Sequence, residues 1–231
     1  FLDYIMEEKG YSTNTLAAYR NDLSQFVEQI ESKIDSWEQV DRNLIIDYIM
    51  AMKADQEYAS STVARKVAAI KSFFHYLVDH GLLEDDPTAT LDSPKVRKRL
   101  PKAISAEDLE RLLAEPANDR TAKGLRDRAL LELLYATGLR VTEVVSLDVE
   151  DVNLASSTLR LVRSRDKAER IVPIHDRAIE PLREYMERGR MQLLRDADEQ
   201  ALFLNHRGHR LTRQGLWLIV KHYVREVGIV E

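Results

Sequence analysis

The residues best suited to chemistry in this 231-residue chain are Arg140 and Glu143, which lie three positions apart. Apolar residues surround both charges, and a Gly-Leu break before Arg140 separates two stretches with helical spacing, 125–135 and 141–147. The pattern predicts a buried guanidinium at a helix–turn–helix joint, pointing into a cleft. A buried arginine needs a partner. That partner is either Glu143 in an ion pair or a phosphate, which a planar guanidinium holds with two hydrogen bonds.

A second candidate is the polar stretch 163–169, which carries Arg165 and Lys167 between the strand-like segments 158–162 and 170–174. This pattern predicts a hairpin with a charged turn. Such a turn is commonly an exposed, charged loop with no catalytic role. In the alternative interpretation, Lys167 is a general acid toward a phosphate or its leaving oxygen, since a lysine serves this purpose when neighbouring cations and partial burial lower its pKa.

Composition limits the possible functions. The net charge is −5, and the absence of cysteine excludes disulfides and thiolate sites. The histidines lack the spacing of metal ligands, and the sequence has no glycine-rich phosphate loop, dinucleotide fingerprint or serine elbow. We therefore expect no metal and no cofactor. No apolar run is long enough to span a bilayer and no signal peptide is visible, so we expect a cytoplasmic protein without membrane contact.

The elements that must position these residues fall into two parts. Residues 1–92 have the pattern of a four-helix domain, with helices expected at 1–9, at 14–31, after Asp41 and near 60–80. Candidate N-caps precede three of these helices: Ser12 or Thr13, Asp41, and Ser60 or Ser61.

The second part, residues 103–231, is expected to be mainly helical with a small antiparallel hairpin. A capping box begins at Ser105, and Trp217 and Tyr223 are expected in the core of the last helix. The fold class is therefore mainly α, in two domains.

Prolines and positive charge mark the boundary between the two parts. Residues 93–102 are expected to form an extended basic linker. This linker is either a solvated tether or a contact with a polyanion, and the density of positive charge favours the polyanion. Its basic residues include Lys95, Arg97, Lys98 and Arg99.

Several polar residues near helix starts suit contacts with nucleic acid, because helix-start amides and small polar side chains bind phosphate. The alternative in each case is helix capping with a solvated face. The candidates are Tyr19, Arg20, Ser61, Thr62, Arg65, Lys66, Arg213 and Gln214.

Taken together, these segments resemble the tyrosine recombinase (phage integrase) family, and its Xer-type members most of all. The resemblance covers nearly the whole chain and includes 12–23, 60–77, 137–143, 202–215 and the basic linker after Asp86-Pro87. Segment 12–23 resembles the opening of the family's core-binding domain, which adds Thr15 to the expected DNA contacts. Segment 137–143 is similar to the motif that carries the first catalytic arginine.

The resemblance implies site-specific recombination of double-stranded DNA without metal or ATP. In that chemistry a tyrosine attacks a DNA phosphate to form a 3′-phosphotyrosine, two arginines hold the non-bridging oxygens, and a lysine protonates the 5′-leaving oxygen. Arg140 would be the first arginine, with Glu143 as its support. Counting back from Pro173 places Arg165 at the family's lysine position, two residues before Lys167. We favour Lys167 as the acid, because arginine hardly ever deprotonates.

The chain starts at Phe1 and stops at Glu231, before the family's His-x-x-Arg-His motif and its tyrosine. We therefore expect a piece that binds DNA but lacks the nucleophile. The complete protein is expected to form a homo- or hetero-tetramer on its recombination site, and this piece a monomer off DNA. Two other classes stay open. One is a non-catalytic DNA-binding protein with the recombinase fold, and the other is a helical interaction protein unrelated to DNA.

Overall fold

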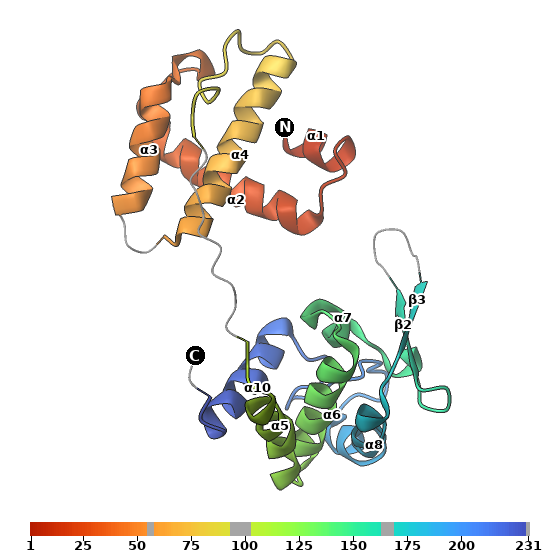
Figure 1. The fold of residues 1–231 in the computed structure, drawn as a ribbon. Helices are drawn as coiled ribbons and strands as arrows, with labels where there is room; N and C mark the ends of the chain where they lie inside the picture. Colours follow the sequence, from red (N-terminus) through yellow and green to blue (C-terminus); the bar gives the residue numbers. More distant parts are fainter. Residues whose placement is uncertain (55–57, 93–102, 163–168, 230–231) are drawn as a thin grey trace. The chain divides into compact units, whose positions relative to one another are not determined.

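The computed structural model describes residues 1–54, 58–92, 103–162 and 169–229, and it divides into two compact units, Phe1–Pro101 and Lys102–Glu231 (Figure 1). Helices dominate both units, and the expected mainly α fold class with a small antiparallel sheet is confirmed. Among the described residues, no helix combines the length and the apolar character needed to cross a bilayer.

The described residues of the N-terminal unit form four α-helices: α1 (Leu2–Glu7), α2 (Thr13–Ile30), α3 (Arg42–Ala54) and α4 (Ser60–Asp79). A short 3-10 turn, Trp37–Gln39, precedes α3. The side chain of Ser12 accepts a hydrogen bond from the Thr15 amide at 3.2 Å, and Asp41 accepts one from the Leu44 amide at 2.8 Å. These contacts confirm two of the expected helix starts.

The start of α4 differs from the expectation. Ala59 is its N-cap, and no side chain of the part of the chain that the structure describes caps the helix. Ser60 and Ser61 therefore lie inside the first turn. The core of this unit is built from the inward faces of α2, α3 and α4, with Phe26, Ile45 and Phe74 fully buried.

The C-terminal unit begins with α5 (Ala106–Ala114), capped by Ser105 as expected. A 3-10 turn (Glu115–Asn118), the long helix α6 (Ala122–Thr137) and the short helix α7 (Val141–Ser146) follow. Beyond the sheet lie α8 (Asp176–Glu184), a π-helical turn (Tyr185–Gly189), α9 (Arg190–Leu193) and α10 (Arg213–Glu226).

The sheet has three antiparallel strands in the order β1 (Val152–Asn153), β2 (Thr158–Val162) and β3 (Glu169–Pro173), and a 3-10 turn, Val149–Asp151, precedes it. The expected hairpin is thus present, and β1 is an addition. A two-residue strand is too short to leave a periodic signal in the sequence.

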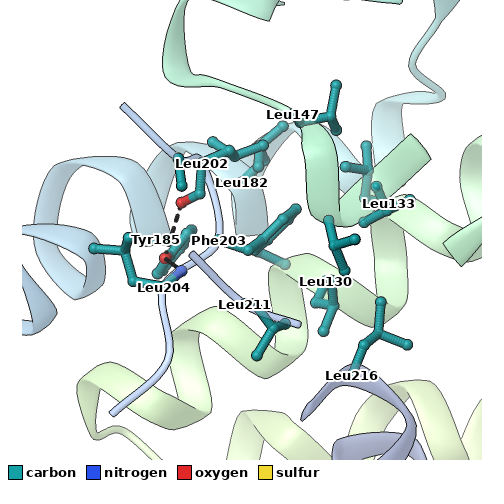
Figure 2. Packing of buried hydrophobic residues seen from close by; sticks show 14 of the residues in the cluster. Leu130, Leu133, Leu147, Leu182, Tyr185, Leu202, Phe203, Leu204, Leu211 and Leu216 are labelled. Atoms are coloured by element: carbon teal, nitrogen blue, oxygen red, sulfur yellow. Dashed lines mark hydrogen bonds between the residues drawn. The ribbon is translucent and has the colours of Figure 1, made fainter. Parts of the chain in front are cut away.

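An irregular segment, 201–204, crosses the core of the C-terminal unit and is held by Tyr185. The Tyr185 hydroxyl donates to the Leu202 carbonyl at 3.0 Å and accepts from the Leu204 amide at 3.1 Å, as Figure 2 shows. The Tyr185 ring stacks on Phe203, with centroids 5.5 Å apart. One phenol therefore satisfies two buried backbone groups that belong to no helix or strand ladder.

Two aromatic residues of α10 behave differently. Tyr223 is buried as expected, and its hydroxyl donates to Asp127 at 3.2 Å. Trp217 was expected in the core, and that prediction is wrong, because 55% of the residue is exposed. The buried stripe of α10 runs through Leu216 and Tyr223, and position 217 lies outside it, where the Lys221 ammonium sits 4.5 Å from the indole centroid.

Candidate active site

The joint that carries Arg140 forms where α6 stops and α7 starts. Gly138 ends α6 in the left-handed conformation, with φ of 60°, and its amide bonds the Leu134 carbonyl at 3.0 Å. Two residues later Arg140 is the N-cap of α7, and the Glu143 carboxylate accepts a hydrogen bond from its backbone amide at 2.8 Å. The expected helix–turn–helix joint is confirmed, and Glu143 fixes the backbone from which the Arg140 side chain departs.

The Arg140 guanidinium is not buried, and this part of the prediction is wrong. Its side chain is 75% exposed. The neighbouring apolar residues that suggested burial, Leu139, Val144 and Val145, turn into the core, whereas the side chain at the N-cap points to solvent. Arg140 contacts Glu143 at 3.4 Å, a long and exposed ion pair that contributes little to stability. The guanidinium is therefore oriented by Glu143 but accessible to an anion.

Glu143 serves a second arginine as well. Its Oε1 atom is 3.2 Å from Nη2 of Arg170, on β3, and 3.4 Å from Nη1 of Arg140. The Glu143 side chain is 23% exposed and the Arg170 side chain 44%. One carboxylate thus joins the start of α7 to β3, and the three side chains carry a net charge of about +1.

Arg210 holds the other end of α7. Its Nη1 atom donates to the carbonyls of Val145 and Leu147, each at 3.1 Å, and Nη2 contacts the Asp148 carboxylate. Carbonyls at a helix C-terminus lack partners within the helix, and a guanidinium supplies them. The sequence gives no specific signal for this role, because Arg210 and α7 are more than sixty positions apart.

The hairpin residues Arg165 and Lys167 lie outside the described residues. On the strand β2, Arg160 holds the hairpin through its Nη2 atom, which lies 2.9 Å from Glu150 and 3.2 Å from Asp151. The Asp151 carboxylate raises the pKa of the Arg160 guanidinium. Arg160 thus belongs to an ion-pair network separate from Glu143, on the strand next to Arg170.

The start of α10 gathers polar groups around a pocket of about 490 Å³. Thr212 caps the helix by accepting from the Gly215 amide at 3.0 Å, and Arg213 and Gln214 are exposed in the first turn. Residues that line the pocket include Arg126, Asn205, His206, Arg207, Thr212 and Gln214. The expected contact residues Arg213 and Gln214 therefore stand on an accessible helix start with further basic residues beside it.

A truly buried arginine of the C-terminal unit is Arg126, which is 6% exposed. Its guanidinium bonds the Asp127 carboxylate at 2.8 Å and the Leu204 carbonyl at 3.0 Å. Burial raises the pKa of Asp127, although the adjacent Arg126 charge opposes the shift. Arg126 is thus committed to a structural ion pair, the role that the sequence left open for Arg140.

The DNA-contact candidates of the N-terminal unit separate into accessible and engaged residues. Arg20 and Ser61 are exposed, and Thr15, Tyr19 and Thr62 are partly exposed. Arg65 is 42% exposed and pairs with Asp22 of α2.

Lys66 was expected on the polar face of its helix, and this placement is wrong. The residue is 2% exposed, and its ammonium lies 3.5 Å from the buried Asp22 carboxylate. The ammonium also contacts the Gln25 side chain and lies 5.5 Å from the centroid of the Tyr58 ring. Lys66 therefore joins α2 to α4 inside the unit. The expected linker contacts Lys95, Arg97, Lys98 and Arg99 lie outside the described residues.

These observations define a class of protein: two helical units, one of which presents an accessible arginine at a helix joint, tethered by a carboxylate and flanked by a β-hairpin. Comparison with known proteins gives the family. Residues 102–231 match the model of the phage integrase family, and residues 1–81 match the model of the phage integrase N-terminal SAM-like domain.

Relatives with high identity include the tyrosine recombinase XerC of Herpetosiphon aurantiacus, 48% identical over 99% of this chain and 74% of the relative. The tyrosine recombinase XerD of Staphylococcus epidermidis is 42% identical over 96% of this chain and 75% of the relative. The chain therefore belongs to the phage integrase family of tyrosine recombinases, enzymes that transfer DNA strands in site-specific recombination.

Solved structures agree in fold. The XerH site-specific recombinase bound to a palindromic difH substrate superposes with a TM-score of 0.76 at 18% identity, over 100% of this chain and 68% of that one. The lambda integrase tetramer bound to a Holliday junction gives a TM-score of 0.71 at 14% identity, over 100% of this chain and 65% of that one. At such identities the likeness concerns the fold alone.

Proposed function

We propose that Arg140 is the arginine of this recombinase that holds the non-bridging oxygens of the DNA phosphate at which a strand is cut and rejoined. The observation that carries the proposal is its combination of exposure and orientation. The guanidinium is 75% exposed, yet the Glu143 carboxylate fixes its backbone at 2.8 Å and contacts its side chain at 3.4 Å. A phosphate can therefore bind without the desolvation of a buried arginine.

In the proposed reaction a tyrosine oxygen attacks the phosphorus, the bond to the 5′-oxygen breaks, and a 3′-phosphotyrosine forms. A 5′-hydroxyl of the partner duplex then reverses the step, so that the proposed reaction consumes no ATP and requires no metal. Negative charge builds on the non-bridging oxygens as the phosphorus becomes five-coordinate, and a fixed cation at this point stabilises the transition state more than the ground state. Arg140 supplies that charge and Glu143 keeps it in place.

We assign the proton for the 5′-leaving oxygen to Lys167, with Arg165 as the competing residue. The support is chemical and topological. Both residues lie in the sequence between β2 and β3, and β3 contacts Glu143 through Arg170. A lysine releases its proton far more readily than an arginine.

We further propose that both units contact double-stranded DNA at a specific recombination site. In the N-terminal unit this role is supported by accessible residues of α2, Thr15, Tyr19 and Arg20. On α4 it is supported by Ser61, Thr62 and the 42% exposed Arg65. In the C-terminal unit Arg213 and Gln214 support it, and residues 93–102 would form a basic linker between the units. Tetramer assembly on DNA and a cytoplasmic location follow from the same proposal.

The test uses a version of the chain that includes the tyrosine nucleophile implied by the family, with formation of the covalent protein–DNA complex as the readout. Arg140→Ala is expected to lower the rate of complex formation by about 100-fold or more, the loss typical of one oxyanion-stabilising donor. A normal rate for this variant would refute the role of Arg140.

The same assay with sulfur in place of the 5′-bridging oxygen identifies the acid. Loss of the true acid is rescued on this substrate, because a thiolate leaves without protonation. Rescue of Lys167→Ala and not of Arg165→Ala supports the assignment, and the reverse result overturns it. If the extended protein binds its site but never forms a covalent complex, the alternative of a non-catalytic DNA-binding protein holds.

A further inference from the structure

Arg170 makes a contact in the C-terminal unit to which the proposed reaction assigns no role. It lies near the start of β3, in register with Leu161 of β2. Its guanidinium reaches across to α7 and contacts Oε1 of Glu143 at 3.2 Å, the same oxygen that lies 3.4 Å from Arg140. The second Glu143 oxygen accepts from the Arg140 backbone amide at 2.8 Å. Both oxygens of this carboxylate are therefore in use, and two guanidinium groups share one of them.

The sharing changes the charge that Arg140 offers to a phosphate. With Arg170 present, one carboxylate faces two guanidinium groups, and the cluster has a net positive charge. Without Arg170, the Glu143 carboxylate would face Arg140 alone, and the pair would be neutral. In the second arrangement the full Glu143 charge competes with an anion for the Arg140 guanidinium, and this consequence of losing Arg170 requires the charge on Glu143.

The sharing also fixes geometry. Glu143 belongs to α7 and Arg170 to β3, so their contact joins the helix that presents Arg140 to the hairpin that carries Lys167. Catalysis of phosphoryl transfer needs the charged groups around the phosphate to be held in fixed positions relative to one another.

We propose that Arg170 is a positioning residue for strand transfer. It takes part of the Glu143 charge, leaves Arg140 free to bind the DNA phosphate, and ties β3 to α7. This inference rests on the proposed role of Arg140. It differs from a direct phosphate contact by Arg170 in one respect, because a positioning role depends on Glu143 and a direct contact does not.

The test is a double-mutant cycle on the 231-residue chain, with a DNA duplex that this chain selects from a random-sequence pool. Fluorescence anisotropy measures the Kd of the wild type, Arg170→Ala, Glu143→Gln and the double variant. We expect Arg170→Ala to weaken binding about tenfold in the wild-type background and less than about twofold in the Glu143→Gln background. Arg170→Lys should recover part of the loss, since lysine pairs with a carboxylate through a single point charge.

Arg160→Ala is the matched control. Arg160 lies on the neighbouring strand with a similar exposure of 38%, but its partners are Glu150, Asp151 and Glu169. We expect its loss to change the Kd by less than about twofold. Thermal unfolding of every variant shows whether the fold is intact, and the exposed Arg170 pair predicts a melting temperature close to that of the wild type.

Three results would overturn the positioning role. An equal loss for Arg170→Ala in both backgrounds would show a direct contact with DNA. An equal loss for Arg160→Ala would show a general charge effect of the hairpin. No loss for Arg170→Ala beside a clear loss for Arg140→Ala would show that Arg140 needs no such partner. If Arg140→Ala forms the covalent protein–DNA complex at the wild-type rate, the proposed function fails, and the positioning role fails with it.

Discussion

Removal of Arg210 tests whether α7, the helix that presents Arg140, is held from its far end. The Arg210 guanidinium donates to the carbonyls of Val145 and Leu147, each at 3.1 Å, and contacts Asp148. The Arg210→Ala variant leaves these groups to water. A hydrogen bond to a charged donor contributes about 1.5–3 kcal/mol when it is buried. Because the Arg210 side chain is 39% exposed, water replaces much of each contact when it is lost, and we expect a loss of about 2 kcal/mol for the three contacts together, well below the sum for three buried bonds.

The loss should be local, since α7 has six residues and depends on contacts outside itself. Hydrogen exchange measured by mass spectrometry on peptides covering 141–149 is the appropriate assay. A local destabilisation of about 2 kcal/mol corresponds to exchange roughly thirtyfold faster in this segment. Arg207→Ala, an exposed arginine on the same loop, is the control and should leave the exchange unchanged. Unchanged exchange at 141–149 in folded Arg210→Ala would refute the reasoning.

Three further predictions concern the cores of the two units. Tyr185→Phe leaves the Leu202 carbonyl and the Leu204 amide without their shared partner, and should lower the free energy of unfolding measured by urea denaturation by about 1–3 kcal/mol. An unchanged free energy of unfolding would mean that water replaces the hydroxyl. Burial raises the pKa of Tyr185 to about 12, so the phenol stabilises the fold fully below its unfolded pKa of about 10 and loses that contribution as the pH rises toward 12. Between about pH 10 and 12 the free energy of unfolding should therefore fall more in the wild type than in Tyr185→Phe, and equal decreases would contradict the assignment. Lys66→Met removes a partner of the buried Asp22 carboxylate and should lower the free energy of unfolding of the N-terminal unit by about 2–4 kcal/mol. The salt dependence of DNA binding should stay the same, and a smaller salt dependence would show that Lys66 contacts phosphate.

Local sequence signals predicted the elements of this fold well where side chains close to each other in the chain decide the structure. Ser12, Asp41 and Ser105 each cap a helix at or within one residue of the expected start. The glycine at position 138 correctly predicted the joint between α6 and α7, because the left-handed conformation at a helix end favours glycine.

The errors arose where burial depends on partners far away in the chain. Lys66 is drawn inside by Asp22, 44 positions earlier, and no local pattern reveals that pairing. Arg140 was expected to be buried because its neighbours are apolar, but an N-cap side chain projects outward while those neighbours turn inward. Arg170 and Arg210 reach α7 across 27 and more than 60 positions, so the network around the candidate site required the structure.

The salt dependence of DNA binding by Arg140→Ala tests the central claim most directly. If Arg140 holds a DNA phosphate, the slope of log Kobs against log salt concentration should fall in magnitude by about 1 relative to the wild type, and Arg140→Lys should keep most of the slope. The melting temperature should stay close to that of the wild type, since the Glu143 pair is exposed and long. A wild-type slope for folded Arg140→Ala would contradict the account, because the guanidinium would then meet no phosphate.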